Sequence, residues 1–301
     1  MKVRRIVFAG LFLIACITVA SAQVKLSFNP EKGKKYEYQT DMTMNIIQSV
    51  MGQTIPMEME MGFKYLMEIT DKTSQEVKVK FTYQEVSYII SSPMMKMSYD
   101  SKNPVENPTG MDQMLSKMFG KLIGQSFQAG IAPDGSVKSV TGMDAVLESM
   151  TGAIADNAQV AAQMGEQMKG QFSDNAIKSS FEQSFKIYPA NAAKAGDTWN
   201  TENVTSVNNM NTSIKTKYTL KEVSRNTATI AVDANVAMDP GAMMEGKLAG
   251  TQSGTIVVDV KTGLPVTNDI TMNIKGSVKA QGVDVQMDLT SKSKTTTKEV
   301  K

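Results

Sequence analysis

The sequence predicts an α+β protein in which a large, curved antiparallel β-sheet, half-barrel-like in shape, carries a central helical insert packed on one face. Three observations predict it. Apolar and polar residues alternate over residues 36–99, the apolar spacing becomes helical over residues 109–188, and the alternation returns from residue 196 onward. This order of sheet, helical insert and sheet is typical of α+β folds rather than of parallel β-α-β units.

The strongest alternating pattern follows Gly52. Apolar residues occupy every second position from Ile55 to Ile69, and glutamates, Lys64 and other polar residues fill many of the positions between them. One face of this long hairpin is therefore expected to meet water and the other a core. In the next strand the parity of the apolar residues changes at Gln84–Glu85, which predicts a β-bulge.

Helical spacing predicts helices over residues 111–122, 143–168 and 177–185. Thr141 and Asp144 resemble a capping box that opens the second helix. Gly152 and Gly165 are the two candidate breaks within it, and Pro189 is expected to stop the last helix.

The chain is expected to form one domain over residues 23–301, with a first β-unit (23–103), a mainly helical insert (104–195) and a second β-unit (196–301). Gly33–Tyr36 opens the first unit as Gly196–Trp199 opens the second. A duplicated β-unit and two unrelated meanders both remain open interpretations. The tail from Ser291, which is rich in Ser, Thr and Lys, is expected to be an exposed strand end or disordered.

Residues 1–22 have the pattern of a secretory signal peptide. Basic residues precede an apolar run from Ile6 to Ala20, and Ala20 and Ala22 form an A-x-A cleavage pattern. The protein is therefore expected to be exported, to the periplasm or the cell exterior. The alternative is a lipid anchor, because Leu13–Cys16 resembles a bacterial lipobox with Cys16 as the lipidated residue. No later segment is apolar enough to predict a membrane-spanning helix.

The composition excludes most catalytic chemistry. The chain has no His, and Cys16 is its single Cys. Histidine bases, Ser-His-Asp or Cys-His pairs, and thiolate or imidazole zinc sites are therefore excluded. No phosphate-binding glycine loop or other cofactor motif occurs, so no cofactor, no metal and no enzymatic activity are predicted. The remaining catalytic option is a pair of placed carboxylates, as glycosidases use.

The charge balance argues against nucleic acid as a partner. Removal of residues 1–22 leaves 29 basic against 30 acidic residues, and Arg225 is then the only arginine. Binding to phosphates needs clustered positive charge, which this chain lacks. Nothing in the pattern predicts an oligomeric state.

Several short motifs together resemble an uncharacterised family of exported proteins from Bacteroidetes. They are the G-x-x-Y start at Gly33–Tyr36, the Met-rich hairpin, Tyr99–Ser101, and Pro189 followed by Gly196–Trp199. The resemblance spans nearly the whole mature chain and implies no particular activity. In architecture alone, a long antiparallel sheet closed by helices is similar to the lipoprotein-carrier proteins of the LolA/LolB type, which is weak evidence for function.

The 24 methionines are the most distinctive feature of the composition. Flexible, polarisable Met side chains suit a cavity that adapts to varied apolar ligands. The function predicted from them is binding or carrying of a lipid or other apolar ligand. The predicted lining residues are Met57, Met59, Met61, Phe63 and Tyr65, with Met111, Leu115 and Met118 as lid residues.

Two alternatives remain open from sequence. A packed core and a cavity lining have the same apolar pattern, so a structural or interaction protein of the cell envelope with a solid interior fits equally well. The thioethers of Met57, Met59 and Met61, and those of Met94, Met95 and Met97, are also a possible ligand set for Cu(I), a soft ion. Because Met57, Met59 and Met61 share the expected core face with Phe63 and Tyr65, apolar packing is the favoured interpretation of these residues.

Overall fold

The computed structural model describes residues 23–154, 158–207, 210–239, 245–280 and 282–300. The predicted signal peptide and Cys16 lie outside these residues. The strands are β1 Lys35–Val50, β2 Gln53–Lys72, β3 Val77–Ser91, β4 Lys96–Asp100, β5 Ser126–Ile131, β6 Val137–Thr141, β7 Thr198–Val207, β8 Met210–Val223, β9 Thr227–Asp239, β10 Glu245–Asp259, β11 Pro265–Ala280 and β12 Val283–Val300. The helices are α1 Gly110–Gly120, α2 Met143–Gly152, α3 Ala158–Phe172 and α4 Asp174–Phe185.

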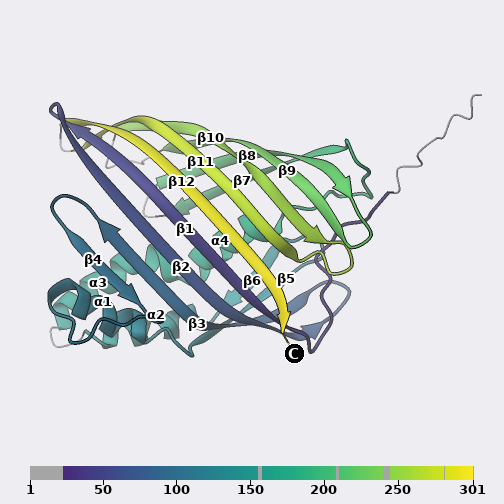
Figure 1. Ribbon diagram of the computed structural model, residues 1–301, viewed down its shortest axis with the longest axis horizontal. Coiled ribbons are helices and arrows are strands. Elements are labelled where there is room, and N and C mark those ends of the chain that lie inside the picture. The colour runs from purple at the N-terminus through teal and green to yellow at the C-terminus, as the bar shows by residue number, and fades with distance from the viewer. Residues whose placement is uncertain (1–22, 155–157, 208–209, 240–244, 281, 301) are drawn as a thin grey trace, which may run out of the picture.

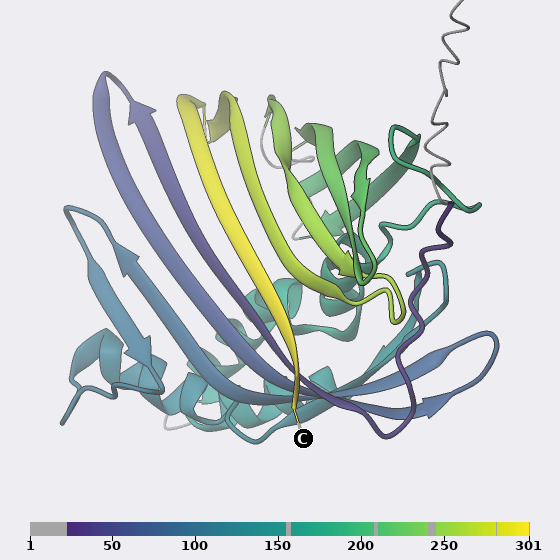
Figure 2. The same ribbon diagram turned by 45° about the vertical axis from the view of Figure 1, so that its right-hand side comes forward.

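Within this described part, all the strands form one antiparallel sheet in the order β6-β5-β3-β2-β1-β12-β11-β10-β9-β8-β7, with β4 paired to β3. The first and last strands of the chain meet in the middle, where Lys35 lies opposite Val300. The sheet is open and strongly curved, as Figures 1 and 2 show. The predicted fold class, a curved antiparallel sheet in an α+β protein, is confirmed.

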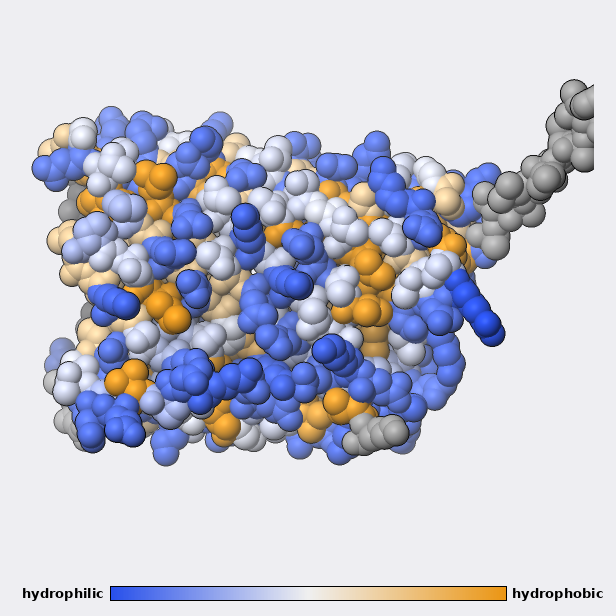
Figure 3. Space-filling model, in the orientation of Figure 1, coloured by the Kyte–Doolittle hydropathy of each residue, from blue (hydrophilic) through white to orange (hydrophobic). Residues whose placement is uncertain are grey.

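The helices lie on the concave side of the sheet. In Figure 2 they lie within the curve that the strands make, and in Figure 1 they lie behind the strands. Helix α4 contacts both β6 and β7, the two edge strands, so it spans the seam that the open sheet leaves. The opposite side, turned away from the helices, is mainly hydrophilic, with apolar residues in separate patches (Figure 3). Single-sided burial of this kind explains the alternating pattern of the strands.

The predicted β-bulge is confirmed. Lys64 of β2 lies opposite Glu85 and Tyr65 lies opposite Tyr83, so Gln84 is the extra residue in β3. Because Gln84 has no partner in β2, the apolar residues before and after it can point to the same side of the sheet. The bulge therefore lets Tyr83 and Val86 both face the core, where each is almost fully buried.

The predicted capping box is wrong, and the predicted second helix is two helices. Helix α2 starts after Gly142, which has a φ of 104° and makes no side-chain cap. The carboxylate of Asp174, at the start of α4, accepts a hydrogen bond of 2.9 Å from the backbone N–H of Met143 instead. A residue remote in the sequence thus caps the helix in place of the predicted local motif. Helix α2 ends at Gly152, whereas Gly165 lies inside α3.

The tail is the end of a strand, one of the two expected outcomes, but it is neither disordered nor wholly exposed. Strand β12 continues to Val300 and lies between β1 and β11, at the centre of the sheet. Ser291, Thr295 and Thr297 point to the concave side and are buried, while Lys292, Lys294 and Lys298 are exposed. The tail alternates like the other strands, but its inward residues carry hydroxyl groups rather than apolar side chains.

The two β-units share a local structure where they begin. Gly33 and Gly196 both have a positive φ, 84° and 95°. The N–H of Gly33 donates to the carbonyl of Ile69 at 2.8 Å, and the N–H of Gly196 donates to the carbonyl of Leu220 at 2.7 Å. In each unit a glycine thus turns the chain into its first strand beside the end of the second strand.

The main core lies between the helices and one half of the sheet. Phe81, Phe127 and Phe181 form a group of contacting rings in it, with centroids 4.8 to 5.7 Å apart. A second, smaller core covers the concave side of β8 to β12, and includes Val236, Leu248 and Ile274. Between these two cores the concave side is hollow.

Candidate functional site

The hollow has a volume of about 510 Å³ and lies between the concave side of the sheet and helices α3 and α4. Nine strands of the sheet contribute residues to its lining, β1 to β3 and β7 to β12. The lining is Tyr38, Thr40, Met42, Met61, Phe63, Tyr65, Tyr83, Tyr88, Gln171, Phe172, Ile177, Ser180, Phe181, Gln183, Ser184, Thr205, Thr212, Ile214, Met238, Gln252, Asn268, Ile270, Met272, Ser291, Ser293 and Thr295. We call this hollow the central cavity.

One wall of the central cavity is aromatic and apolar. Strand alternation brings Met61, Phe63 and Tyr65 of β2 to the same side, and the bulge keeps Tyr83 of β3 beside them. The rings of Phe63 and Tyr65 have centroids 6.2 Å apart and nearly parallel planes, and those of Tyr65 and Tyr83 are 4.8 Å apart. Aromatic rings at these centroid distances are in favourable contact.

The adjoining wall is polar but uncharged. It consists of inward residues of β1, β11 and β12, which adjacent strands bring into one row: Thr40 lies opposite Thr295, and Thr295 opposite Asn268. The hydroxyl group of Thr295 donates to that of Thr40 at 3.3 Å. Ser291 and Ser293 continue this wall along β12.

Helix α4 provides the cover. Ile177, Phe181 and Ser184 recur at spacings of three and four residues, so they share one helix face, and all three line the central cavity. Ser173 caps the helix, because its side chain accepts a hydrogen bond of 3.2 Å from the N–H of Ala176. Exposed Ser180 and Gln183 lie where the cavity meets solvent.

Among the described residues that line the central cavity, none carries a charge. The ionisable groups there are tyrosines, and burial raises the pKa of Tyr38, Tyr65 and Tyr83 above the ordinary range. Their hydroxyl groups therefore stay neutral at physiological pH and act as hydrogen-bond donors and acceptors. A neutral lining of this kind accommodates an uncharged ligand.

We expect the protein to lose its fold cooperatively above about pH 10, where tyrosine in an unfolded chain ionises. Burial is the largest cause of a raised pKa at all eight tyrosines, and it raises the pKa of Tyr36 to about 12. Below pH 10 both states are protonated and stability is complete. Above it only the unfolded state releases protons from the fully buried tyrosines, so stability falls by about 1.4 kcal/mol per pH unit for each of these, and by less for the half-buried Tyr88.

The measurement is tyrosinate absorbance recorded together with circular dichroism during an alkaline titration. The two signals should change together, whereas the chain in urea should titrate gradually near pH 10. Gradual ionisation of all the tyrosines near pH 10 with the β-sheet signal intact would contradict the expectation.

The structure brings together only part of the predicted site. Met61, Phe63 and Tyr65 line the central cavity. Met57 and Met59 lie further along the same side of β2, half-buried and outside the lining. Strand alternation identified the correct side of the hairpin, and the extent of the helical cover determines which part of that side is enclosed.

The predicted lid residues do not line the central cavity. Helix α1 packs against β4, where Leu115 and Met118 are buried and Met111 is 44% exposed. The cover comes from α4 instead. Amphipathic spacing shows that a helix has a buried face, but it does not show which part of the sheet that face will meet.

Sequence reasoning missed the polar wall. The signal in β12 is an alternation of hydroxyl residues with lysines, since Ser291, Ser293 and Thr295 are separated by Lys292 and Lys294. Charged residues at every second position mark the outward side of a strand even when the inward side is polar. That pattern, applied to the tail, would have placed it in the sheet.

The methionines proposed for Cu(I) lie on different strands. Met57, Met59 and Met61 share one side of β2, whereas Met94 lies before β4 and is 84% exposed. In the part of the chain that the structure describes, no group of three His, Cys, Asp or Glu side chains is placed to hold a metal ion.

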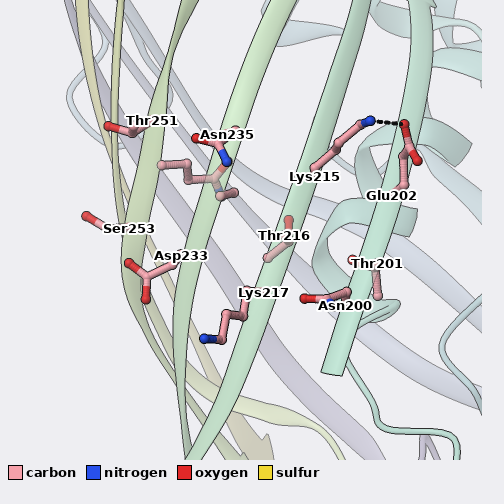
Figure 4. A pocket seen from close by; sticks show the side chains of 12 residues that line it. Asn200, Thr201, Glu202, Lys215, Thr216, Lys217, Asp233, Asn235, Thr251 and Ser253 are labelled. Carbon is pink, nitrogen blue, oxygen red and sulfur yellow. Dashed lines mark ion pairs between the residues drawn. The ribbon is translucent and has the colours of Figure 1, made fainter. Parts of the chain in front are cut away.

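A second hollow, of about 860 Å³, lies over β7 to β10 (Figure 4). Its charged residues, among them Glu202, Lys215, Lys217 and Asp233, are exposed, and it has no aromatic side chain. The ion pair between Lys215 and Glu202 measures 3.5 Å, and both side chains are more than half exposed. A solvated groove of this kind withdraws little ligand surface from water, so the central cavity is the candidate site.

Across the described residues, no helix combines the length and the apolarity needed to cross a membrane. The model of a family described as "Family of unknown function (DUF6263)" matches residues 74–265 of the chain. No curated protein matches the sequence.

Among the solved structures that match, one is similar at the level of the fold. A structure described as "Lipid-protein interactions in lipovitellin" is 11% identical with a TM-score of 0.50; the match covers 89% of this chain and 25% of that one, so the chain spans about a quarter of its length. OccK7 (OpdD) of Pseudomonas aeruginosa is 7% identical with a TM-score of 0.24, covering 89% of this chain and all of its own. The COG4313 outer membrane channel of Pseudomonas putida F1 is 8% identical with a TM-score of 0.25, and the match covers 90% of this chain and 98% of that one. The lipovitellin structure is not described as a carrier of the LolA/LolB type, so that resemblance stays a prediction.

Proposed function

The chain belongs to the DUF6263 family of unknown function, whose model spans more than half of it, and within that family we propose that this protein is an exported, non-catalytic binding protein for a lipid or other apolar ligand. The central cavity is the binding site. The observation that carries the proposal is the cavity itself: about 510 Å³, walled by aromatic and Met side chains on one side and by neutral polar groups on the other. Ligand pockets usually have volumes of about 300–1,000 Å³ and a mainly apolar lining.

A row of half-buried apolar side chains continues beyond the central cavity along β1 and β2. In the register of β1 and β2, Met42 lies opposite Met61, Met44 opposite Met59, and the next inward pair follows in the same direction. Each step of two residues advances about 7 Å along the strands. Of these four methionines, Met42 and Met61 line the cavity, while Met44 and Met59 are half-buried beyond it.

We call this stretch of the concave side, formed by Met44, Ile46, Met57 and Met59, the methionine trough. Water touches its apolar side chains in the unliganded protein, and each square ångström that a ligand covers contributes about 25 cal/mol. Flexible thioether side chains adapt to chains of different shape. The trough thus gives Met57 and Met59, which the sequence singles out, a role beside the cavity.

The fold that the chain shares with lipovitellin is compatible with this proposal, since that structure is described by its lipid–protein interactions. A solid interior, the structural alternative, is hard to reconcile with the central cavity. The non-catalytic part of the proposal rests on the absence of His from the chain and of carboxylates from the lining.

The test is native mass spectrometry of protein purified from its own cell envelope, followed by binding of a fluorescent apolar probe. We expect the purified protein to carry a bound apolar molecule. The fluorescent probe should bind saturably, and the bound molecule should compete with it. Ser293→Trp places an indole in the cavity and should weaken probe binding at least about tenfold, because the space is then filled.

The matched control is Lys294→Trp, on the same strand but exposed on the opposite side of the sheet. It should bind the probe like the unmodified protein. A protein that is always empty and binds no probe, or a Ser293→Trp variant that folds and binds as well as the control, would refute the proposed function.

A further inference from the structure

The polar wall of the central cavity has a specific chemistry. Its hydroxyl groups lie close together. Thr295 donates to Thr40. Burial raises the pKa of Tyr38, and the neighbouring hydroxyl groups of Ser184 and Thr295 offset part of that rise. Tyr38 and Thr295 are buried. Each group both donates and accepts hydrogen bonds. Three elements, β1, β12 and α4, therefore contribute hydroxyl groups to one neutral hydrogen-bonding cluster.

Asn268 is the incomplete member of this cluster. It lies opposite Thr295 in the sheet and lines the central cavity, yet its side-chain carbonyl oxygen is buried without a hydrogen-bond partner. Buried polar groups are nearly always paired, so an unpaired one calls for a partner from outside the chain. Rotation of the amide exchanges its oxygen and its NH₂ group, and Asn268 can thus serve a partner as acceptor or donor.

The cluster has no charge to offer an anion. Within the described lining no Lys or Arg occurs, and Arg225, the arginine between β8 and β9, is exposed and absent from that lining. Moving an ionised carboxylate or phosphate from water to such a site is strongly unfavourable, because no opposite charge compensates its lost hydration. A hydroxyl or amide group loses much less hydration and regains its hydrogen bonds there.

We propose that the natural ligand is a neutral amphiphile with a hydroxyl or amide head group, of the class of long-chain alcohols and monoacylglycerols. Its head group binds at Asn268, Thr295 and Tyr38, and its apolar chain runs past Met42 and Met61 into the methionine trough. This inference rests on the proposed function and adds to it the chemical class and the orientation of the ligand.

The test uses a series of probes with the same chain length and different heads: a fatty alcohol, a monoacylglycerol, the methyl ether of the alcohol, and the fatty acid at a pH where it is ionised. Each displaces the fluorescent apolar probe from the purified protein. We expect the alcohol and the monoacylglycerol to bind at least about tenfold more tightly than the ether and the ionised acid, the ratio that one hydrogen bond of about 1.4 kcal/mol gives.

Asn268→Leu should reduce the preference for the alcohol over the ether to less than about threefold while the ether still binds. The matched control is Asn273→Leu, an asparagine of the same strand that is exposed on the opposite side of the sheet. Thr295→Val, which keeps the shape of the side chain, is a second variant if Asn268→Leu does not fold. It should reduce the preference in the same direction.

The outcomes separate the two proposals. Equal binding of all four probes, tighter binding of the acid, or a preference that survives in both Asn268→Leu and Thr295→Val would overturn the inference on the head group and leave the proposed function standing. Failure of every probe to bind would overturn both.

Discussion

Removal of residues 291–301 is expected to leave the chain without its native fold. These residues pair with β1 on one side, from Met44 opposite Ser291 to Lys35 opposite Val300, and with β11 on the other. Their loss breaks backbone hydrogen bonds along both sides of a central strand, each with a net value of about 0.5–1.5 kcal/mol. The sum is comparable to the whole stability of a typical domain, about 5–15 kcal/mol.

The measurement is far-ultraviolet circular dichroism together with resistance to proteolysis. A finer version replaces Lys294, whose side chain is exposed but whose backbone lies between Asp41 and Asp269. Lys294→Pro should destabilise the protein by about 3 kcal/mol or more, because proline removes a ladder hydrogen bond in the middle of a sheet. Lys294→Gln, the control, should change stability by less than about 0.5 kcal/mol. A truncated chain with native dichroism and melting temperature would contradict this account.

Phe81→Ala is expected to destabilise the protein by about 3–5 kcal/mol, the usual cost of truncating a buried phenylalanine. The side chain of Phe81 is fully buried. Its ring lies 4.8 Å from that of Phe181, 5.2 Å from Phe127 and 6.0 Å from Tyr65. It thus joins the sheet to helix α4 directly beneath the central cavity, and its removal opens a void that these rings fill only in part.

Urea unfolding measures the effect as a lower midpoint with an unchanged slope. Lys78→Ala is the matched control, since Lys78 is an exposed residue of the same strand, and it should shift stability by less than about 0.5 kcal/mol. A loss of less than about 1 kcal/mol in Phe81→Ala would show that the aromatic group is not the support of the fold that its packing indicates.

Most strands could be predicted because each has one wet and one buried side. The run from Ile55 to Ile69 alternates so regularly that its side, its length and its partner in the hairpin all follow from the sequence. The bulge at Gln84 was predictable for the same reason, because a change of parity in the apolar residues has no other regular explanation. The start of α2 was not, since its capping group, Asp174, is remote in the sequence.

The candidate site was predictable only on one wall. Met61, Phe63 and Tyr65 follow from alternation, whereas the hydroxyl wall carries no apolar signal. Interior polar residues in β12 look like solvent-exposed ones when a composition rich in Ser, Thr and Lys is the only guide. Their burial depends on the neighbours β1 and β11, and residues more than two hundred positions away provide one of them.

By itself, the sequence determined the α+β class, the alternating sides of the strands and the positions of most helices, because these follow from local periodicity. Its residue types also determined that the described chain has no histidine or cysteine chemistry. Only the tertiary structure decided that β12 closes the centre of the sheet, that α4 rather than α1 covers the hollow, and that neutral hydroxyl and amide groups meet aromatic rings across it. The physical reason is that pairing register and helix docking depend on contacts between segments far apart in the chain, and a one-dimensional pattern records which side of a segment is buried but not what buries it.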